Sequence, residues 1–350
     1  MRLGSIRWVL RALPWVLAGC SGPEGQAGTS ETPTTLGTLS GTSTVTAGST
    51  TDTEASTTTE PSTDTDPPAP ATGTGEDPKF DLGIQPDVGQ DVEDGCTKVD
   101  FLFVVDNSGS MEDDQANLIA NFPNFITGIQ STLENVDEYH VGVVTTDAYT
   151  GNLPACQVLG GLVSRTGGTA SSNQICGPYA DGRNYMTEMD DLASSFACAA
   201  QVGVAGNGIE RPMNAMEAAV RGDHAAAGQC NEGFLRDDAL LVVVIISDEW
   251  DGPNDPELDG SSGDAASWYD TVVDAKQGLA ENIVVVTLSH INGGTCPPGD
   301  EFFNPADIQT FTEMFGDNGF QGCITGDFGQ IFMDATGVID EACDNFVPPG

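Results

Sequence analysis

Basic residues are scarce in this sequence, in which 11 Lys and Arg stand against 53 Asp and Glu for a formal net charge of −42. A surface this negative repels the phosphate backbone of DNA and RNA, so nucleic-acid binding is excluded as a function. Most of the carboxylates are expected to form a solvated surface that keeps the protein soluble. A few local acidic clusters are instead candidates for binding a hard cation, because such cations take oxygen ligands.

Long apolar runs and catalytic motifs are also missing. The longest apolar run, residues 239–246, is far short of the ~20 residues that a membrane-spanning helix needs. None of the three histidines has a zinc-binding spacing, no Gly-x-Ser-x-Gly turn precedes a helix, and no phosphate-binding P-loop is present. We therefore predict that the protein is not an enzyme, with a metal-dependent hydrolase as the less favoured alternative.

The N-terminal residues have the pattern of an export signal. Basic residues precede the apolar stretch 12–18, and Leu17-Ala18-Gly19-Cys20 follows, which resembles the lipobox of bacterial lipoproteins. We predict a signal peptide over 1–19 and acylation of Cys20, which would make lipid the only attachment to a membrane. Ser21 in place of Asp favours the outer membrane or cell surface over retention at the inner membrane.

The region after Cys20 lacks the residues that build a core. Residues 21–78 contain 18 Thr and no aromatic, Lys or Arg, so they cannot bury enough apolar surface to offset the entropy of ordering. We predict a disordered Thr/Ser/Pro/Gly linker over 20–78, and an acidic lead-in over 79–95 before the folded domain.

Eight cysteines remain when Cys20 is set aside, and none forms a Cys-x-x-Cys pair. An even number in an exported chain predicts four disulfides and argues against a zinc site. Cys96 and Cys343 bracket the folded region, so we expect them to pair; the sequence leaves the other pairings open. The remaining candidates are Cys156, Cys176, Cys198, Cys230, Cys296 and Cys323.

Strand and helix patterns alternate from residue 96 onward. Apolar strands are predicted at 99–105, 139–145, 239–246 and 283–288, and helices at 118–133, 192–202, 211–221, 265–279 and 328–346. Such alternation predicts an α/β domain over 96–346, with a doubly wound, mainly parallel sheet and helices on both faces. The Gly-rich stretch 148–187 shows no clear period and contains two cysteines, so we interpret it as an insertion held by disulfides.

The first predicted strand runs into Asp106-Asn107-Ser108-Gly109-Ser110-Met111. In a doubly wound sheet, ligands bind beyond the carboxyl ends of the strands, where Asp106 is expected to lie. As the chain turns into the following helix, Asp106, Ser108 and Ser110 can direct one carboxylate and two hydroxyls to a common point. Oxygen ligands of this kind suit Mg²⁺ or Mn²⁺.

The segment Val-Asp-Phe-Leu-Phe-Val-Val-Asp-Asn-Ser-Gly-Ser-Met, residues 99–111, resembles the first strand and the Asp-x-Ser-x-Ser loop of von Willebrand factor type A (vWA) domains. In that family the loop forms a metal-ion-dependent adhesion site. The resemblance implies that Asp248, which follows the central strand, completes the site. It also implies a Thr before a later helix, within a Gly-rich turn.

This sequence departs from the family pattern at that Thr, where Glu210 stands after the turn Gly206-Asn207-Gly208-Ile209. If Glu210 is a ligand, three carboxylates surround one cation, which favours Ca²⁺ or a mainly structural site. If it is not, Glu210 is a residue favoured at a helix N-terminus by the helix dipole. An acidic loop nearby, with Asp251, Asp255, Glu257 and Asp259, is interpreted as solvated, with a second calcium site as the alternative.

From these features we predict a lipid-anchored surface module that coordinates Mg²⁺, Ca²⁺ or Mn²⁺ through Asp106, Ser108, Ser110 and Asp248, with or without Glu210. By the resemblance, its partner is a protein or an extracellular-matrix ligand that offers an acidic group to the metal. The alternative is a calcium-stabilised structural protein in which no ligand reaches the metal.

Overall fold

The structure is a computed structural model that describes residues 95–132, 136–248, 251, 260–291, 296 and 306–350. The predicted signal peptide 1–19, Cys20, the linker 20–78 and the lead-in up to residue 94 lie outside the described residues. Within the part that is described, no helix is long and apolar enough to cross a membrane.

The domain is built on a five-stranded sheet in which every neighbouring pair is parallel. The strand order is β2-β1-β3-β4-β5. The strands are β1 (Lys98–Val105), β2 (Glu138–Thr145), β3 (Leu240–Ile246), β4 (Ile283–Ser289) and β5 (Gly319–Cys323). Because β3 is central and fully buried, its sequence Leu-Leu-Val-Val-Val-Ile-Ile is apolar throughout. The predicted doubly wound α/β fold is confirmed.

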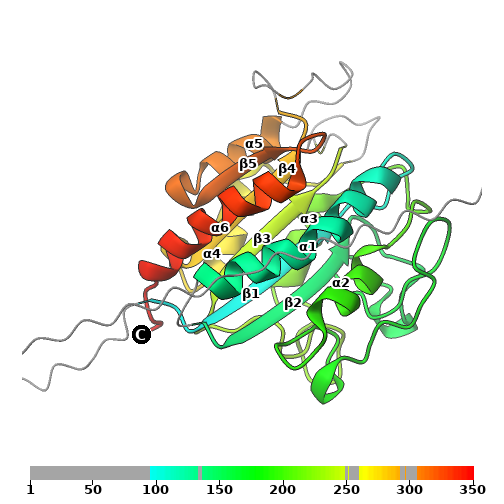
Figure 1. Cartoon of the computed structure of the whole chain (residues 1–350), viewed down its shortest axis with the longest axis horizontal. Helices are drawn as coiled ribbons and strands as arrows, with labels where there is room; N and C mark the ends of the chain where they lie inside the picture. The colour runs from blue at the N-terminus through cyan, green and yellow to red at the C-terminus, as the bar shows by residue number, and fades with distance from the viewer. Residues whose placement is uncertain (1–94, 133–135, 249–250, 252–259, 292–295, 297–305) are drawn as a thin grey trace, which may run out of the picture. The chain divides into compact units, whose positions relative to one another are not determined.

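Helices cover both faces of the sheet (Figure 1). One face packs against α1 (Glu112–Thr132), α2 (Leu192–Ala200) and α6 (Phe328–Asp344). The other packs against α3 (Pro212–Val220), α4 (Ala265–Ala275) and α5 (Ala306–Glu313). Short 3₁₀ turns occur at Pro154–Cys156, Ala180–Gly182, Ala280–Asn282 and Gly316–Asn318.

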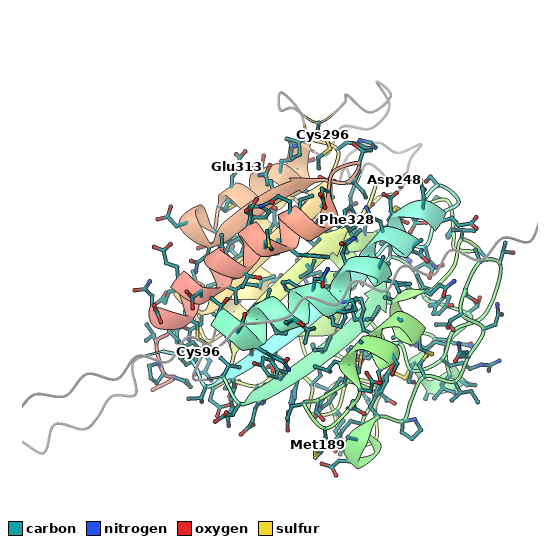
Figure 2. All side chains as sticks on the ribbon, viewed as in Figure 1. Cys96, Met189, Asp248, Cys296, Glu313 and Phe328 are labelled. Carbon is teal, nitrogen blue, oxygen red and sulfur yellow. A yellow bond between two sulfur atoms is a disulfide. The ribbon has the colours of Figure 1, made fainter. Side chains whose placement is uncertain are left out.

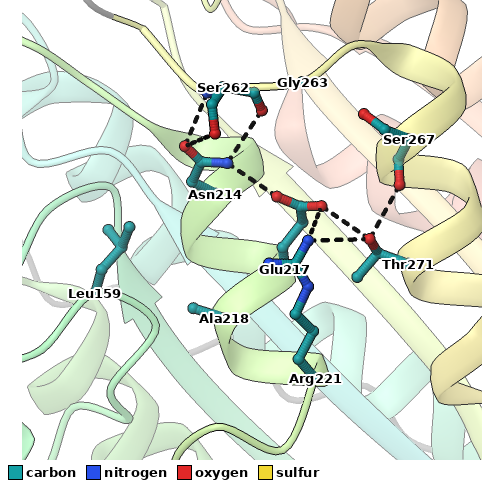
Figure 3. Close-up of a pocket in the computed structure, with 9 residues that line it drawn as sticks. All are labelled: Leu159, Asn214, Glu217, Ala218, Arg221, Ser262, Gly263, Ser267 and Thr271. Carbon is teal, nitrogen blue, oxygen red and sulfur yellow. Dashed lines mark hydrogen bonds and ion pairs between the residues drawn. The ribbon is translucent and has the colours of Figure 1, made fainter.

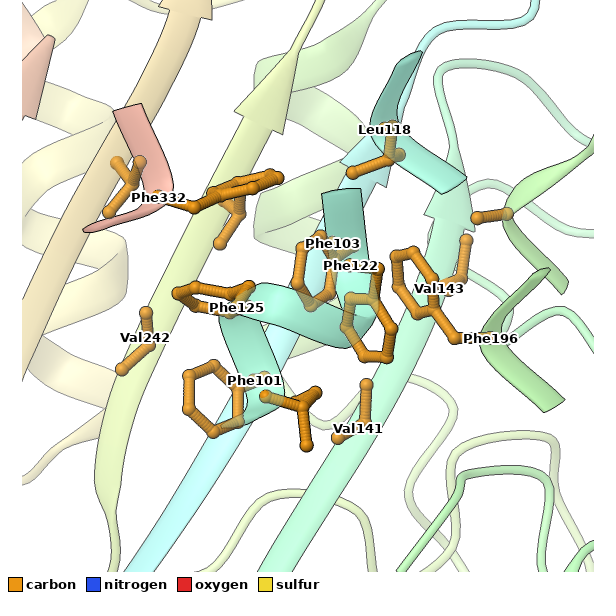
Figure 4. Close-up of a cluster of buried hydrophobic side chains, with 14 of the residues drawn as sticks. Phe101, Phe103, Leu118, Phe122, Phe125, Val141, Val143, Phe196, Val242 and Phe332 are labelled. Atoms are coloured by element: carbon orange, nitrogen blue, oxygen red, sulfur yellow. The ribbon is translucent and has the colours of Figure 1, made fainter. Parts of the chain in front are cut away.

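Alternate residues of each strand supply the two cores. Phe101 and Phe103 point to the α1 face, whereas Leu102 and Val104 point to the α3 face. On the α1 face, Phe122 stacks on Phe196 with ring centroids 3.5 Å apart, and Phe103 meets both rings edge-on (Figure 4). These aromatic contacts hold α1 and α2 against the sheet, and they fix the turn between β1 and α1.

Four disulfides staple the domain, as predicted. Cys96 pairs with Cys343, which confirms the expected link between the two ends of the domain. The other pairs are Cys156–Cys230, Cys176–Cys198 and Cys296–Cys323. Cys156 and Cys176 both lie in the predicted insertion 148–187, so two of the four bridges fasten that stretch to the rest of the domain.

Two elements were not predicted from the sequence. Strand β5 reads Gly-Phe-Gln-Gly-Cys and is only partly buried at the edge of the sheet, so it carries no apolar run. Helix α5 is eight residues long, and the residues just before it are not among those that the structure describes. Both are placed by packing against β4 and each other, which local sequence patterns do not encode.

Candidate metal-binding site

Asp106 and Asp248 lie at the carboxyl ends of two neighbouring strands. Asp106 follows β1 and Asp248 follows β3, and the register pairs Val105 with Ile246. The Asp106 backbone N–H donates to the Ile246 carbonyl at 3.0 Å. In this strand order the sheet reverses its winding between β1 and β3, which is the place where doubly wound sheets bind ligands. Figure 2 shows Asp248 at the opposite end of the domain from Cys96.

The Asp106 carboxylate is fully buried and held from two sides. It accepts hydrogen bonds from the Ser108 backbone N–H at 2.8 Å and from the Ser247 hydroxyl at 2.6 Å. Burial, with a smaller contribution from the nearby charge of Asp248, raises the pKa of Asp106 to about 7 against the lowering effect of these hydrogen bonds. No Lys or Arg within the described residues pairs with Asp106.

Oxygen atoms of other side chains gather around this carboxylate. The Ser108 and Ser110 hydroxyl oxygens lie 3.2 Å apart. The Asp248 Oδ1 atom is buried and has no hydrogen-bond partner among the described residues. Desolvation of such an oxygen is costly unless a donor or cation compensates it. Two hydroxyls and two carboxylates, one of which has a buried oxygen without a partner among the described residues, are a donor set that fits a hard divalent cation.

Asp114 is a further carboxylate near these residues, and it belongs to an acidic first turn of α1 with Glu112 and Asp113. It is half-buried on the first turn of α1. Burial raises its pKa to about 7, and the charges of Asp113 and Asp248 act in the same direction. The repulsion from Asp248 indicates that Asp114 shares the negative field of the site.

Glu210 is buried at the end of the neighbouring strand β2. Its Oε2 atom accepts a hydrogen bond from the Thr146 hydroxyl, and Arg211 donates its backbone N–H to the Thr146 carbonyl at 3.1 Å. Among the described residues, no group of three or more His, Cys, Asp or Glu side chains is arranged to hold a metal ion. The structure thus brings Asp106 and Asp248 together and anchors Glu210 to β2.

Two residues not singled out as ligands join the loops of the site. Asn107 is buried; its amide N–H donates to Asp147 at 3.3 Å, and its amide oxygen accepts from Thr146 at 3.1 Å. Asp147 also accepts from the Asn207 backbone N–H at 3.1 Å. A side chain at Gly206 would have its Cβ 2.6 Å from the Asn107 carbonyl oxygen, so this close approach of backbones requires glycine.

Gln115 links the backbone of the Asp106 loop to the loop that precedes α3. It is buried, and its amide nitrogen donates to the carbonyls of Asp106 and Gly203, both at 2.9 Å. Its amide oxygen accepts from the Gly203 backbone N–H at 3.0 Å. A polar residue on the buried stripe of α1 was the sequence signal that could have revealed this role.

Replacing Gln115 by Met is expected to weaken Mg²⁺ binding about 10-fold, because it frees the Asp106 backbone to shift while leaving the ligands in place. Calorimetric titration of the oxidised, metal-free protein measures the effect. Gln330→Met, at an exposed position of α6, is the matched control and is expected to bind as the unsubstituted protein does. Equal affinity of both variants would contradict a positioning role for Gln115.

The acidic loop after β3 is described only in part. Asp251 is buried; it accepts from the Met213 backbone N–H at 3.1 Å and from the Ser261 backbone N–H. It therefore fastens this loop to the start of α3. Asp255, Glu257 and Asp259, named above as an alternative calcium site, lie outside the described residues.

Comparisons with known proteins give likenesses of fold only. No protein-family model matches the chain, and no curated protein matches it. Among solved structures, it is similar to proximal thread matrix protein 1 from the mussel byssus, at 13% identity and a TM-score of 0.37, over 71% of this chain and 49% of that one. It is also similar to a von Willebrand factor type A protein from Catenulispora acidiphila, at 13% identity and a TM-score of 0.35, over 71% and 43%. The chain thus spans less than half the length of these two structures.

Proposed function

We propose that this protein is a surface binding module that coordinates one divalent cation and uses it to hold a protein or matrix partner. The observation that carries the proposal is the pairing of the Asp106-x-Ser108-x-Ser110 loop with Asp248 at the winding reversal of the sheet. Asp106, Ser108, Ser110 and Asp248 would hold Mg²⁺, Mn²⁺ or Ca²⁺. When bound, the cation would offer an open position to a carboxylate of the partner, as in the vWA domains that the loop resembles.

The geometry supports a site with few carboxylates. The Thr146 hydroxyl engages one oxygen of Glu210, so we place Glu210 beside the ligand sphere as a residue that joins β2 to α3. Two carboxylates and two hydroxyls leave a divalent cation close to neutral, and a neutral centre accepts an anionic ligand better than one surrounded by three carboxylates. This arrangement favours the binding module over the calcium-stabilised structural protein.

The position of the site also suits presentation from a surface. Residue 95, where the described residues begin, lies just before β1, and Asp106 lies beyond the end of this strand. The two are therefore separated by roughly the length of a strand, ~25 Å. We propose that the linker 20–78, attached through acylated Cys20 to the outer membrane or cell surface, tethers the domain there. The four disulfides support an exported location.

Calorimetric titration of the oxidised, metal-free full-length chain with Mg²⁺, Mn²⁺ and Ca²⁺ tests the metal site. We expect one ion per chain, and an affinity about 100-fold or more weaker for Asp106→Ala, because that variant loses a carboxylate that no neighbour replaces. Glu210→Thr is expected to keep the site, because Glu210 is placed beside the ligand sphere and not in it.

Asp113→Ala is the control, because Asp113 is an exposed carboxylate on the first turn of α1. If Asp106→Ala binds as tightly as Asp113→Ala, the site is not at the Asp106 loop and the proposal fails. If instead Glu210→Thr loses the ion altogether, Glu210 is a ligand and the calcium-stabilised structural protein becomes the better description.

A further inference from the structure

A polar recess opens directly beside the proposed metal site. It has a volume of about 450 Å³ and is lined by Asn207, Ile209, Arg211, Asn214, Gly260 and Ser262. Asn207 and Ile209 precede Glu210 in the Gly-rich turn, and Arg211 follows it. The same turn contacts the Asp106 loop, because the Gly206 backbone N–H donates to the Asn107 carbonyl at 2.9 Å. Ile209 is 37% exposed, which leaves an aliphatic side chain open to a partner.

The charge of this recess differs from that of the chain as a whole. The protein has 53 acidic and 11 basic residues, yet the described residues that line the recess include one guanidinium and no carboxylate. The acidic surface of the protein repels an acidic peptide segment. At the recess, the same segment is attracted by the positive charge of Arg211. Electrostatic complementarity of this kind selects both the partner and its orientation.

Arg211 is available for such a partner. Its backbone N–H is used by the Thr146 carbonyl, but no hydrogen bond or ion pair engages its guanidinium within the described part of the chain. By contrast, Arg236 forms an ion pair with Asp100 at 2.7 Å, and the Lys276 ammonium donates hydrogen bonds to three backbone carbonyls. Among the described residues, the Arg211 guanidinium is therefore a positive charge without a protein partner at the recess.

The recess continues into a second hollow between α3 and α4. The two share Asn214 and Ser262, and the second hollow has a volume of about 410 Å³ (Figure 3). Its one carboxylate, Glu217, is buried and neutralised by Arg221, 2.7 Å away. The Arg221 side chain is 50% exposed at the far end. Ten residues separate Arg211 from Arg221, so about 15 Å of helix lies between them.

We propose that the recess and the hollow form one groove that binds an extended acidic peptide segment of the partner. The inference rests on the proposed function. One carboxylate of the segment would take the metal, a second would pair with Arg211, and Ile209 would contact an aliphatic side chain between them. Arg221 already pairs with Glu217, so the hollow would take only the continuing peptide backbone, and the distance to Arg221 corresponds to about four or five residues of extended peptide.

The test is selection of peptides on the full-length, oxidised protein. A displayed random library, with inserts of about 12 residues to exceed the groove's length, is panned in millimolar Mg²⁺, and bound phage are released with a chelator. We expect peptides with two or more acidic residues around an aliphatic one. A synthetic copy of one such peptide, measured by fluorescence anisotropy, is expected to bind Arg211→Gln about 10-fold or more weakly than the unsubstituted protein, since a charge-assisted hydrogen bond is lost.

Arg165→Gln is the matched control, because Arg165 is exposed and, within the described residues, has no ion pair; its affinity is expected to be unchanged. Binding that needs Mg²⁺ but is the same in Arg211→Gln and Arg165→Gln would overturn the groove and leave the proposed function standing. Absence of any Mg²⁺-dependent peptide would count against the proposed function and the groove together. Mg²⁺-dependent binding of polygalacturonate without any peptide would keep the metal site and overturn the peptide as its occupant.

Discussion

Replacing Cys96 and Cys343 together by alanine is expected to lower the free energy of unfolding by about 5 kcal/mol, because the bridge closes a very long loop. The two residues are 247 positions apart, and the chain-entropy cost of a loop grows with the logarithm of its length. The other three disulfides lie within this loop and shorten it, but the logarithm leaves the expected value nearly unchanged. Urea-induced unfolding of both proteins measures the difference.

Cys176→Ala with Cys198→Ala is the comparison, since these two residues are only 22 positions apart. The same relation then gives a loss of about 3 kcal/mol. In the native state, the backbone N–H of Cys96 also donates to the Cys343 carbonyl at 2.9 Å, so the two ends should stay adjacent in the folded variant. A smaller loss for the long loop than for the short one would show that chain entropy does not dominate here.

In a chelator at pH 8, Asp106→Asn is expected to be more stable than the unsubstituted protein, by up to about 4 kcal/mol. Burial raises the pKa of Asp106 from 3.8 to about 7 in the native state. Below about pH 4 the carboxyl is protonated in both states and contributes nothing. As the pH rises toward 7, the unfolded state loses its proton first, so stability falls; above about pH 7 the loss is complete.

Thermal unfolding between pH 4 and pH 8 tests this expectation. The two proteins should have similar melting temperatures at pH 4 and diverge as the pH rises. Mg²⁺ at pH 8 should stabilise only the unsubstituted protein, because a ligand stabilises the state that binds it. The lowered pKa of His140, about 4 through burial, acts in the opposite direction in both proteins and cancels. Asp113→Asn should follow the unsubstituted protein, and if Asp106→Asn does so as well, ionised Asp106 does not destabilise the native state.

The core of the fold could be predicted from local sequence patterns. Strand β3 is apolar throughout because it is buried on both faces, and the stripe on α1 contains Phe122, Phe125 and Ile129, all of them buried. The pairing of Cys96 with Cys343 followed from their positions at the two ends of the domain. Strand β5 and helix α5 were missed because their short sequences carry no strong period.

The candidate metal-binding site could be predicted from the sequence only in part. The Asp106 loop stood out because its polar residues follow a buried strand at once, whereas Asp248 was expected from the resemblance of that loop to vWA domains. Glu210 was left between ligand and helix-start residue; the hydrogen bond from Thr146, 64 positions away in the sequence, is a contact that no local pattern reports. Gln115 and Asn107 were overlooked because their roles depend on loops that fold back from distant parts of the chain.

By itself, the sequence determined the class of the fold, the acidic character of the chain and the segment that carries the proposed metal ligands, because burial, net charge and strand-to-loop transitions are properties of neighbouring residues. Only the tertiary structure decided that Asp106 and Asp248 follow neighbouring strands, that Glu210 is bonded to Thr146 just after β2, and that Arg211 lines a recess whose described residues include no carboxylate. These facts depend on strand order and loop packing, which bring together residues that are far apart along the chain.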